Sequence, residues 1–465
     1  MRENLGLIGA GSATFTRGLV ADILQSGLDC ELRLVDIDPE ALAVAEGLVK
    51  KMIEAKGAKI RLSASTDRRA VLKGASVVIS TIGVGGRRAW ETDVYIPRKF
   101  GIFQPVGDSV MPGGTSRALR MIPAMAEIAA DVLDLAPEAL FFNYANPMAA
   151  ICRGARKATG AEIIGLCHGV QSIAHELEAI LNLSRGSLAY TAVGMNHLTW
   201  FTEARADGRD VFPKLRAFVE HALARDLKKT ELGEQFEERN RAEESEATPL
   251  NPFCWKLFLL CGAYPCPGDR HVTEFFPHLF RGEGSYFGKT LGVDAFPLER
   301  WTRHGDKVYA EMREAGLSSA PLPREYFDQI SGEHSEALDI LRSIRKDERR
   351  RFSANLPNRG QVPNLPEDAV VECPAVADAS GLKAVLQPPL DPFIAGTLAT
   401  RFQWAETVVD AALEGSREKF VQALILDGAV TSLDIAERLA DALLSAQAEY
   451  LPRFHGSKAK KKGNG

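Results

Sequence analysis

The chain has 465 residues, of which 45% are hydrophobic and 25% are charged, and its formal net charge is −5. This composition is ordinary for a globular protein and excludes a largely disordered chain. The slightly acidic balance also argues against a nucleic-acid-binding protein, because such proteins carry a basic field.

The first 150 residues alternate short apolar runs with stretches of helical periodicity. This alternation indicates parallel strands with helices on both faces, and such strands are nearly continuous apolar runs because both their faces are buried. We therefore predict an α/β fold with a Rossmann-like doubly wound parallel sheet, in an NAD-binding domain over residues 1–195. The predicted strands are 5–8, 31–36, 76–82, 140–144 and 163–167, and predicted helices include 17–25 and 39–53.

The pattern changes after about residue 191, and we predict a second, α+β domain over 196–455 for substrate binding and oligomerisation. The Pro- and Asn-rich stretch at 353–392 is expected to be mostly loop or irregular strand. The basic tail over 456–465 is expected to be disordered. The remaining features are an apolar, aromatic stretch at 194–202, a charged helical stretch at 213–245, the Pro- and Asn-rich stretch at 353–392, and helical patterns at 396–425 and 432–449.

A glycine turn directly follows the first predicted strand. Gly9 allows a tight turn, and Gly11 lets the backbone approach a pyrophosphate, to which the Ser12 hydroxyl can donate. Thr14 replaces the third glycine of the dinucleotide fingerprint, so a glycine turn without a ligand is the alternative. Asp36 ends the next strand, where a carboxylate suits a ribose 2′-hydroxyl and repels a 2′-phosphate. These residues predict NAD, rather than NADP, as the cofactor.

A cysteine and a histidine are candidate metal ligands. Cys167 ends a predicted strand, and His197 lies thirty residues further along. These two side chains can share a divalent ion with oxygen ligands from substrate or water, whereas the four closely spaced ligands of a structural zinc site are not visible. From the spacing alone, an inert buried cysteine and a core histidine remain the alternatives.

The cysteines also bear on the compartment. All seven are widely scattered, and their odd number does not resemble a disulfide framework. No apolar run approaches the ~18 residues of a membrane span, and the N-terminus lacks the basic start and apolar stretch of a secretory signal. We expect a cytoplasmic protein without a membrane partner.

Motifs spread over nearly the whole chain become specific when they are taken together. In chain order they are GAGSATFTRGLV (9–20), LVDID (34–38), STIGVGG (80–86), GDSVMPGGTSRALRMIP (107–123), FNYANP (142–147), LCHGV (166–170), GMNHLTWF (194–201), GDRHVTEFFP (268–277) and NLPEDAVVE (364–372). In this order they resemble glycoside hydrolase family 4, the NAD- and metal-dependent glycosidases. One departure is Met111, where the family often has Gly.

The resemblance implies a divalent ion, typically Mn²⁺, held by Cys167 and His197. It also implies hydrolysis without net oxidation. NAD⁺ takes hydride from C3 of the sugar, a base removes the C2 proton, and the aglycone leaves by elimination with help from an acid. Water then adds, and the hydride returns to C3.

The resemblance further implies roles for individual residues. His168 occupies the place of the leaving-group acid, with a role in holding the metal loop as the alternative. Asp269 is the implied C2 base, with Tyr264 as the second candidate, and a helix cap is the alternative for Asp269. Asn146 matches a substrate or cofactor contact, and Asn-Pro turn chemistry is its alternative.

The sequence Cys-His-Gly-Val at 167–170 is more similar to the α-galacturonidase branch than to the α-glucosidase or α-galactosidase branches. The resemblance therefore implies an unphosphorylated α-galacturonide as substrate, with an α-glucoside or α-galactoside as alternatives. A uronate needs a cation for its C6 carboxylate. Arg88 and Arg270 are candidates, as are Arg87 and Arg117, and a solvated surface arginine is the alternative for each.

Two other classes of protein share some of these features. An NAD-dependent 2-hydroxy-acid dehydrogenase, similar in fold to lactate and malate dehydrogenases, has the expected sheet but needs no metal cysteine. A non-catalytic NAD or sugar sensor would bind ligand without turnover. Family members are commonly dimers or tetramers, so the resemblance also implies a homo-oligomer.

Overall fold

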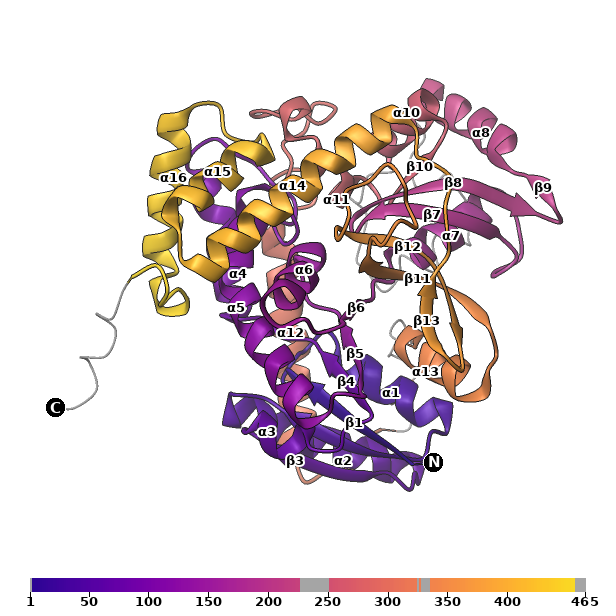
Figure 1. The fold of residues 1–465 in the computed structure, drawn as a ribbon, viewed down its shortest axis with the longest axis vertical. Helices are drawn as coiled ribbons and strands as arrows, with labels where there is room; N and C mark the ends of the chain where they lie inside the picture. Colours follow the sequence, from indigo (N-terminus) through magenta and orange to yellow (C-terminus); the bar gives the residue numbers. More distant parts are fainter. Residues whose placement is uncertain (1, 226–250, 324–325, 328–334, 456–465) are drawn as a thin grey trace.

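The structure is a computed structural model that describes residues 2–225, 251–323, 326–327 and 335–455 (Figure 1). The predicted basic tail over 456–465 and the part of the predicted helical stretch beyond residue 225 lie outside the described residues. No helix among the described residues is both long and apolar enough to span a bilayer.

The first half of the chain builds a parallel sheet. Its strands are β1 (Glu3–Ile8), β2 (Cys30–Val35), β3 (Arg61–Ser65), β4 (Val77–Ser80), β5 (Leu140–Asn143) and β6 (Ile164–Gly165). They lie in the order β3-β2-β1-β4-β5-β6, and every neighbouring pair is parallel. This arrangement confirms the Rossmann-like prediction. The strand order reverses between β1 and β4, which is where doubly wound sheets bind their ligands.

The same sheet continues in antiparallel strands beyond β6. These are β11 (Arg350–Pro357), β12 (Val370–Asp378), β7 (Ala189–Met195), β8 (Leu198–Ala206) and β10 (Tyr264–Cys266), in that order, with β13 (Gly381–Ala384) on β12 and β9 (Arg209–Asp210) on β8. The expectation of loop or irregular strand over 353–392 is therefore wrong for β11 and β12. Both are regular strands, because their apolar side chains are buried in the sheet, and that packing outweighs the Pro and Asn content.

Helices cover both faces of the parallel half and form most of residues 392–446. They are α1 (Thr16–Ser26), α2 (Pro39–Lys56), α3 (Arg68–Leu72), α4 (Gly86–Arg98), α5 (Met111–Leu135), α6 (Met148–Thr159), α7 (Gly169–Ile180), α8 (Phe212–Arg225), α10 (Pro252–Cys261), α11 (Asp269–Val272), α12 (Leu298–Leu317), α13 (Glu336–Lys346), α14 (Pro392–Glu414), α15 (Arg417–Asp427) and α16 (Leu433–Ala446). Short 3₁₀ turns include η2 (Thr273–Phe275), η3 (Pro277–Leu279) and η5 (Ala448–Tyr450). In Figure 1 the C-terminal helices lie beside α4, α5 and α6.

Local sequence sets the helix ends. The Asp38 carboxylate accepts the first backbone N–H groups of α2, and Gly57 closes the same helix in a left-handed conformation. Gly415 divides the predicted helix over 396–425 into α14 and α15, because it also adopts a left-handed conformation, and the Ser416 hydroxyl then caps α15. Each such cap stabilises its helix by about 1 kcal/mol.

The hydrophobic core joins the two predicted domains. One buried cluster combines the strands β1 and β2 with residues from α12, α13, β11 and β12. Helix α12 approaches α2 closely at a pair of glycines, since a Cβ on Gly47 would lie 2.3 Å from the carbonyl oxygen of Gly316. Segments late in the sequence thus complete the core of the Rossmann half, and the boundary at residue 195 stays a prediction.

Candidate active site

The predicted cofactor residues meet at the carboxyl ends of β1 and β2. Gly9 has φ +90°, and a Cβ there would lie 2.9 Å from the backbone nitrogen of Ile82. The Gly11 N–H donates to Oδ2 of Asp36 at 2.8 Å, and a Cβ on Gly11 would approach that oxygen to 2.9 Å. Ser12 stands next in the same turn. The structure therefore brings these residues together, with two positions that only a glycine fits.

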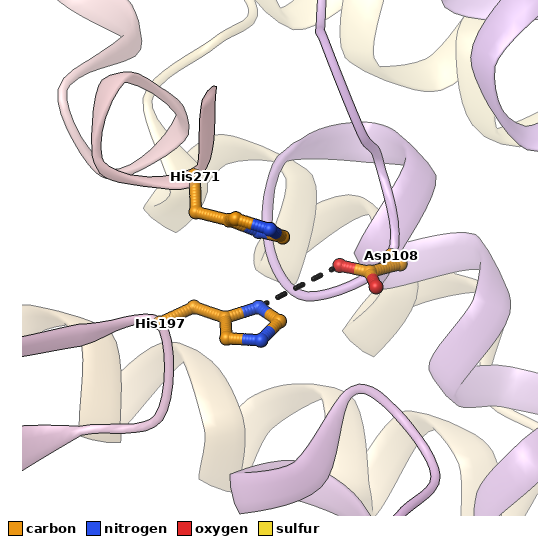
Figure 2. A group of neighbouring side chains, drawn as sticks. All are labelled: Asp108, His197 and His271. Atoms are coloured by element: carbon orange, nitrogen blue, oxygen red, sulfur yellow. Dashed lines mark ion pairs between the residues drawn. The ribbon is translucent and has the colours of Figure 1, made fainter. Parts of the chain in front are cut away.

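His197 is the buried centre of a second group, at the opposite half of the sheet. It occupies the turn between β7 and β8 with φ +67°. Asp108, from the loop before α5, places Oδ1 3.8 Å from Nδ1 of His197. The ring of His271, from α11, lies over that of His197 with the ring centroids 4.1 Å apart. Figure 2 shows the three side chains pointing toward one another, and their ligand atoms all lie within 4.8 Å.

Ser109 links the carboxylate and the imidazole. Its hydroxyl donates to Oδ1 of Asp108 at 2.8 Å and lies 2.7 Å from Nδ1 of His197. A hydroxyl has a single proton, so when that proton goes to Asp108, the serine oxygen accepts from the Nδ1–H of the imidazole. The lone pair of the neutral ring then resides on Nε2. This relay orients the imidazole ring of His197 within the cluster.

Burial disfavours the protonated form of both imidazoles. Desolvation lowers the pKa of His197, and the nearby Asp108 carboxylate partly opposes this effect. Desolvation also lowers the pKa of His271 well below its usual range, and the charges of His197, Arg270 and His168 lower it further. The buried Nδ1 of His271 has no hydrogen-bond partner among the described residues. The cluster therefore offers nitrogen lone pairs to a cation.

Cys167 follows β6, close to this cluster but outside the group of three. The Gly169 N–H donates to its sulfur at 3.4 Å, and burial raises the pKa of the thiol to about 12. The side chain of Asn196, the neighbour of His197, hydrogen-bonds to the thiol and acts in the opposite direction. His168 is exposed at the start of α7, and its charge influences both cluster imidazoles.

The substrate candidates divide into two sets. Asn146 donates from Nδ2 to Oδ2 of Asp108 at 3.1 Å, and its carbonyl accepts from Nε of Arg117 at 2.9 Å. Arg270 precedes His271 and stacks on Trp301, with its guanidinium carbon 3.8 Å from the ring centroid. These three residues accompany the cluster.

Arg88 belongs to the other set. Its side chain is 61% exposed and forms ion pairs with Glu91 and Asp306 on α4 and α12. Arg87 also pairs with Asp306. The structure therefore ties both arginines to the contact between these two helices rather than to the cluster.

Asp269 and Tyr264, the candidate bases, are both fully buried. The Asp269 carboxylate accepts from the backbone N–H groups of Phe253 and Cys254, each at 2.8 Å, and from the Tyr286 hydroxyl at 2.6 Å. These bonds cap the first turn of α10, and burial raises the Asp269 pKa to about 6. Tyr264 lies within the hydrophobic cluster formed by α7, α8 and α10.

Glu372 holds the turn that carries His197. Its Oε2 accepts from the Thr199 hydroxyl at 2.8 Å and from Nδ2 of Asn196 at 3.4 Å, so it grips the turn that carries His197 on both sides. The side chain is 1% exposed, and burial raises its pKa to about 7. Burial and the neighbouring Glu372 carboxylate together raise the pKa of Glu336 to about 8.

The sequence analysis did not single out Asp108, Ser109 or His271. All three lie inside motifs that were recognised as blocks, at 107–123 and 268–277. A polar Asp-Ser pair just before the Pro-Gly-Gly sequence that begins α5 was the available signal for the first two. Only the fold brings the two blocks to the same histidine.

Comparisons with known proteins agree with this architecture. A sequence model of the family 4 glycosyl hydrolases matches residues 4–183, and a model of the family 4 glycosyl hydrolase C-terminal domain matches 192–430. The chain is 30% identical to an α-galactosidase of Rhizobium meliloti (strain 1021) over 97% of this chain and 89% of that protein. It is also 30% identical to an α-galacturonidase of Bacillus subtilis (strain 168), over 91% and 92%.

Among solved structures, the fold is similar to that of a 6-phospho-α-glucosidase from gut microorganisms in complex with NAD and Mn²⁺. The TM-score is 0.80 at 21% identity, covering 97% of this chain and 99% of the other. At this identity the likeness establishes the fold.

Proposed function

The chain belongs to the family 4 glycosyl hydrolases, and from this premise we propose that it hydrolyses unphosphorylated α-glycosides with the help of NAD and a divalent metal ion. The observation that carries the proposal is the convergence of Asp108, His197 and His271 within 4.8 Å. The dehydrogenase alternative needs no such metal cluster. A cofactor turn at the end of β1 accompanies them.

The residues at the end of β1 fit a dinucleotide. A Cβ on Gly9 would clash with the backbone of Ile82, and one on Gly11 would clash with Asp36, so both glycines keep the tight turn that a pyrophosphate-binding loop needs. The Asp36 carboxylate is held by the Gly11 N–H at the place where a ribose 2′-hydroxyl binds. When bound, NAD supplies a hydride acceptor for the sugar. The NAD-containing structure of similar fold supports this assignment.

The cluster fits a divalent ion of the Mn²⁺ type, because carboxylate oxygen and imidazole nitrogen suit such ions. We propose that His197 holds the ion, with Asp108 and His271 beside it and Cys167 joining as a thiolate. The orphaned nitrogen of His271 is the observation that supports a cation here. When bound, such an ion stabilises negative charge that develops on sugar oxygens.

We propose His168 as the acid that delivers a proton to the glycosidic oxygen, because it is exposed beside the cluster. Asp269 remains the proposed C2 base, and its pKa of about 6 suits that task. Its contacts, however, equally support the helix-cap alternative. A base must be released from the N–H groups of Phe253 and Cys254 before it reaches a sugar.

A kinetic isotope effect separates these two roles of Asp269. For Asp269→Asn we expect residual activity with an increased isotope effect for substrate deuterated at C2, because proton removal becomes slower than the other steps. If the residue only caps α10, the variant loses thermal stability, and its isotope effect equals that of the wild type.

We propose an α-galacturonide as the substrate, since Arg270 lies beside the cluster and offers a planar cation to a C6 carboxylate. α-Galactosides and α-glucosides remain the alternatives. An α-galactosidase and an α-galacturonidase are each 30% identical to the chain, so identity does not decide between these two substrates. We expect Arg270→Lys to lower kcat/KM for an α-galacturonide more than for an α-galactoside. Arg88→Lys is the matched control and should change neither value.

The test of the proposed function is a panel of p-nitrophenyl glycosides, including the α-galacturonide, with NAD⁺, Mn²⁺ and a thiol reductant, each omitted in turn. We expect p-nitrophenol release that requires both NAD⁺ and Mn²⁺, without accumulation of NADH. NADH accumulation with hydroxy acids and no glycoside cleavage would support the dehydrogenase instead. The homo-oligomer and the cytoplasmic location stay predictions.

A further inference from the structure

Glu274 is a buried carboxylate that connects two parts of the cluster. It lies in η2 and is 1% exposed. Its Oε1 accepts from the backbone N–H groups of Val106 and Gly107, each at 2.8 Å. These two residues immediately precede Asp108. Glu274 follows His271 by three residues, so one short segment carries the histidine and also grips the loop that carries the carboxylate.

The loop before Asp108 has a shape that depends on such a grip. Gly107 has φ +62°, and a Cβ there would lie 2.5 Å from Nε2 of Gln104. Gln104 is itself buried, and its amide donates to the Asp93 carbonyl and accepts from the Gly113 N–H. The loop is thus packed tightly on its inner side. The N–H groups of Val106 and Gly107 face the segment from the second half of the chain.

Two adjacent N–H groups in a buried loop need an acceptor, because an unpaired buried donor is costly. A single carboxylate oxygen satisfies both here, and it does so across 167 and 168 positions of sequence. The length of the glutamate side chain and the direction of Oε1 therefore determine where the loop lies. That loop in turn determines how far Asp108 stands from His197.

We propose that Glu274 is a positioning residue for the metal cluster: it fixes the Asp108 loop against the Arg270–His271 segment by accepting two backbone N–H groups. This role depends on the reach of the side chain and on one acceptor oxygen, and not on its negative charge. The inference rests on the proposed function, in that it takes the cluster to be a metal site.

Two variants separate reach from charge. Glu274→Gln keeps the length and one acceptor oxygen but removes the charge. Glu274→Asp keeps the charge but shortens the side chain by one methylene group. The matched control is Glu178, which is also buried and accepts from two loop N–H groups, those of Gly186 at 2.9 Å and Leu188 at 2.8 Å, at the far end of α7.

Two measurements are made on full-length protein. Mn²⁺ affinity is obtained from the electron paramagnetic resonance signal of free Mn²⁺, and amide hydrogen exchange is followed for the peptide that contains Val106 and Gly107. We expect Glu274→Gln to bind Mn²⁺ within about threefold of the wild type and Glu274→Asp at least about tenfold more weakly, as for other groups that orient metal ligands. Exchange in the 106–107 peptide should accelerate in Glu274→Asp alone. Glu178→Gln and Glu178→Asp should leave both quantities unchanged.

Wild-type behaviour of Glu274→Asp in both measurements overturns the proposal, because reach would then be irrelevant. Equal weakening by Glu274→Gln and Glu274→Asp also overturns it, because charge would then be responsible. If the wild-type protein binds no Mn²⁺, the proposed metal site fails. The exchange data still decide in that case whether Glu274 holds the loop.

Discussion

The two ends of the sheet build their sites in different ways. The cofactor turn at 9–12 is contiguous in sequence, and its partner Asp36 ends the neighbouring strand. The cluster around His197 takes Asp108 and Ser109 from the loop before α5, and His271 from α11. A contiguous turn carries its geometry in its own glycines, whereas the cluster exists only after the antiparallel strands have joined the sheet. Substitutions in the cofactor turn should therefore weaken NAD⁺ binding alone, and substitutions around His197 should weaken Mn²⁺ binding alone.

The largest expected effect separates the two ends completely. His197→Ala removes the central imidazole, and we expect activity to fall by about a thousandfold or more, since a metal ion contributes several kcal/mol to such reactions. NAD⁺ affinity, measured by quenching of protein fluorescence, should stay within twofold of the wild type. Joint loss of NAD⁺ binding in a folded variant would show that the two sites are not independent.

The buried Glu372 carboxylate, which accepts from Asn196 and Thr199, should make the free energy of unfolding depend on pH. The folded-state pKa of Glu372 is raised from 4.5 to about 7, so its contribution to stability is present below pH 4.5 and is lost as the pH rises through 7. For one group, this difference amounts to about 3 kcal/mol at most.

We therefore expect Glu372→Gln to flatten the decline in the free energy of unfolding between pH 5 and 8, because glutamine does not titrate and still accepts from Thr199. Removing this charge also relieves Glu336, which should flatten the decline further. Urea unfolding at several pH values provides the measurement. An unchanged slope would mean that Glu372 is ionised without cost in the folded protein.

At the cofactor end, Gly11→Ala is expected to act through Asp36. The new Cβ would lie 2.6 Å from Cβ of Ala41 and 2.9 Å from Oδ2 of Asp36, and it would displace that carboxylate. Loss of a hydrogen bond to a charged group should weaken NAD⁺ binding by about tenfold to a hundredfold. Mn²⁺ affinity should be unaffected. A variant with normal NAD⁺ affinity would argue for a glycine turn without a ligand.

The smallest expected effect concerns the relay at His197. Ser109→Ala removes the group that fixes the proton on Nδ1, and we expect about a tenfold loss of Mn²⁺ affinity, as for other partners of metal-bound histidines. Ser116→Ala, in the buried first turns of α5, is the control and should leave the affinity unchanged. Equal Mn²⁺ affinities of the wild type, Ser109→Ala and Ser116→Ala would show that the Ser109 hydroxyl does not orient His197 for metal binding.

Sequence reasoning succeeded where structure is local. The five named strands of the parallel half are all present, although the last is reduced to Ile164–Gly165, because each apolar run is buried on both faces. It failed for β11 and β12, whose regularity comes from pairing with each other and with neighbouring strands. Composition within a stretch contains no information about such partners.

The same division applies to the site residues. Gly9, Gly11 and Asp36 were predictable because they belong to one βαβ unit. Asp108 and His271 were not, since 163 positions separate them and only tertiary packing brings them to His197. Arg88 illustrates the converse: an arginine just after a family motif pairs with Glu91 and Asp306 instead of joining the cluster.

The most direct test of the metal cluster is anomalous diffraction at the manganese absorption edge, from crystals of the protein soaked with Mn²⁺. The account predicts one strong peak within bonding distance of His197, adjacent to Asp108 and His271, and its loss in crystals of His197→Ala. A peak elsewhere in the molecule, or none at saturating Mn²⁺, would contradict the central claim that these segments converge to hold a metal ion.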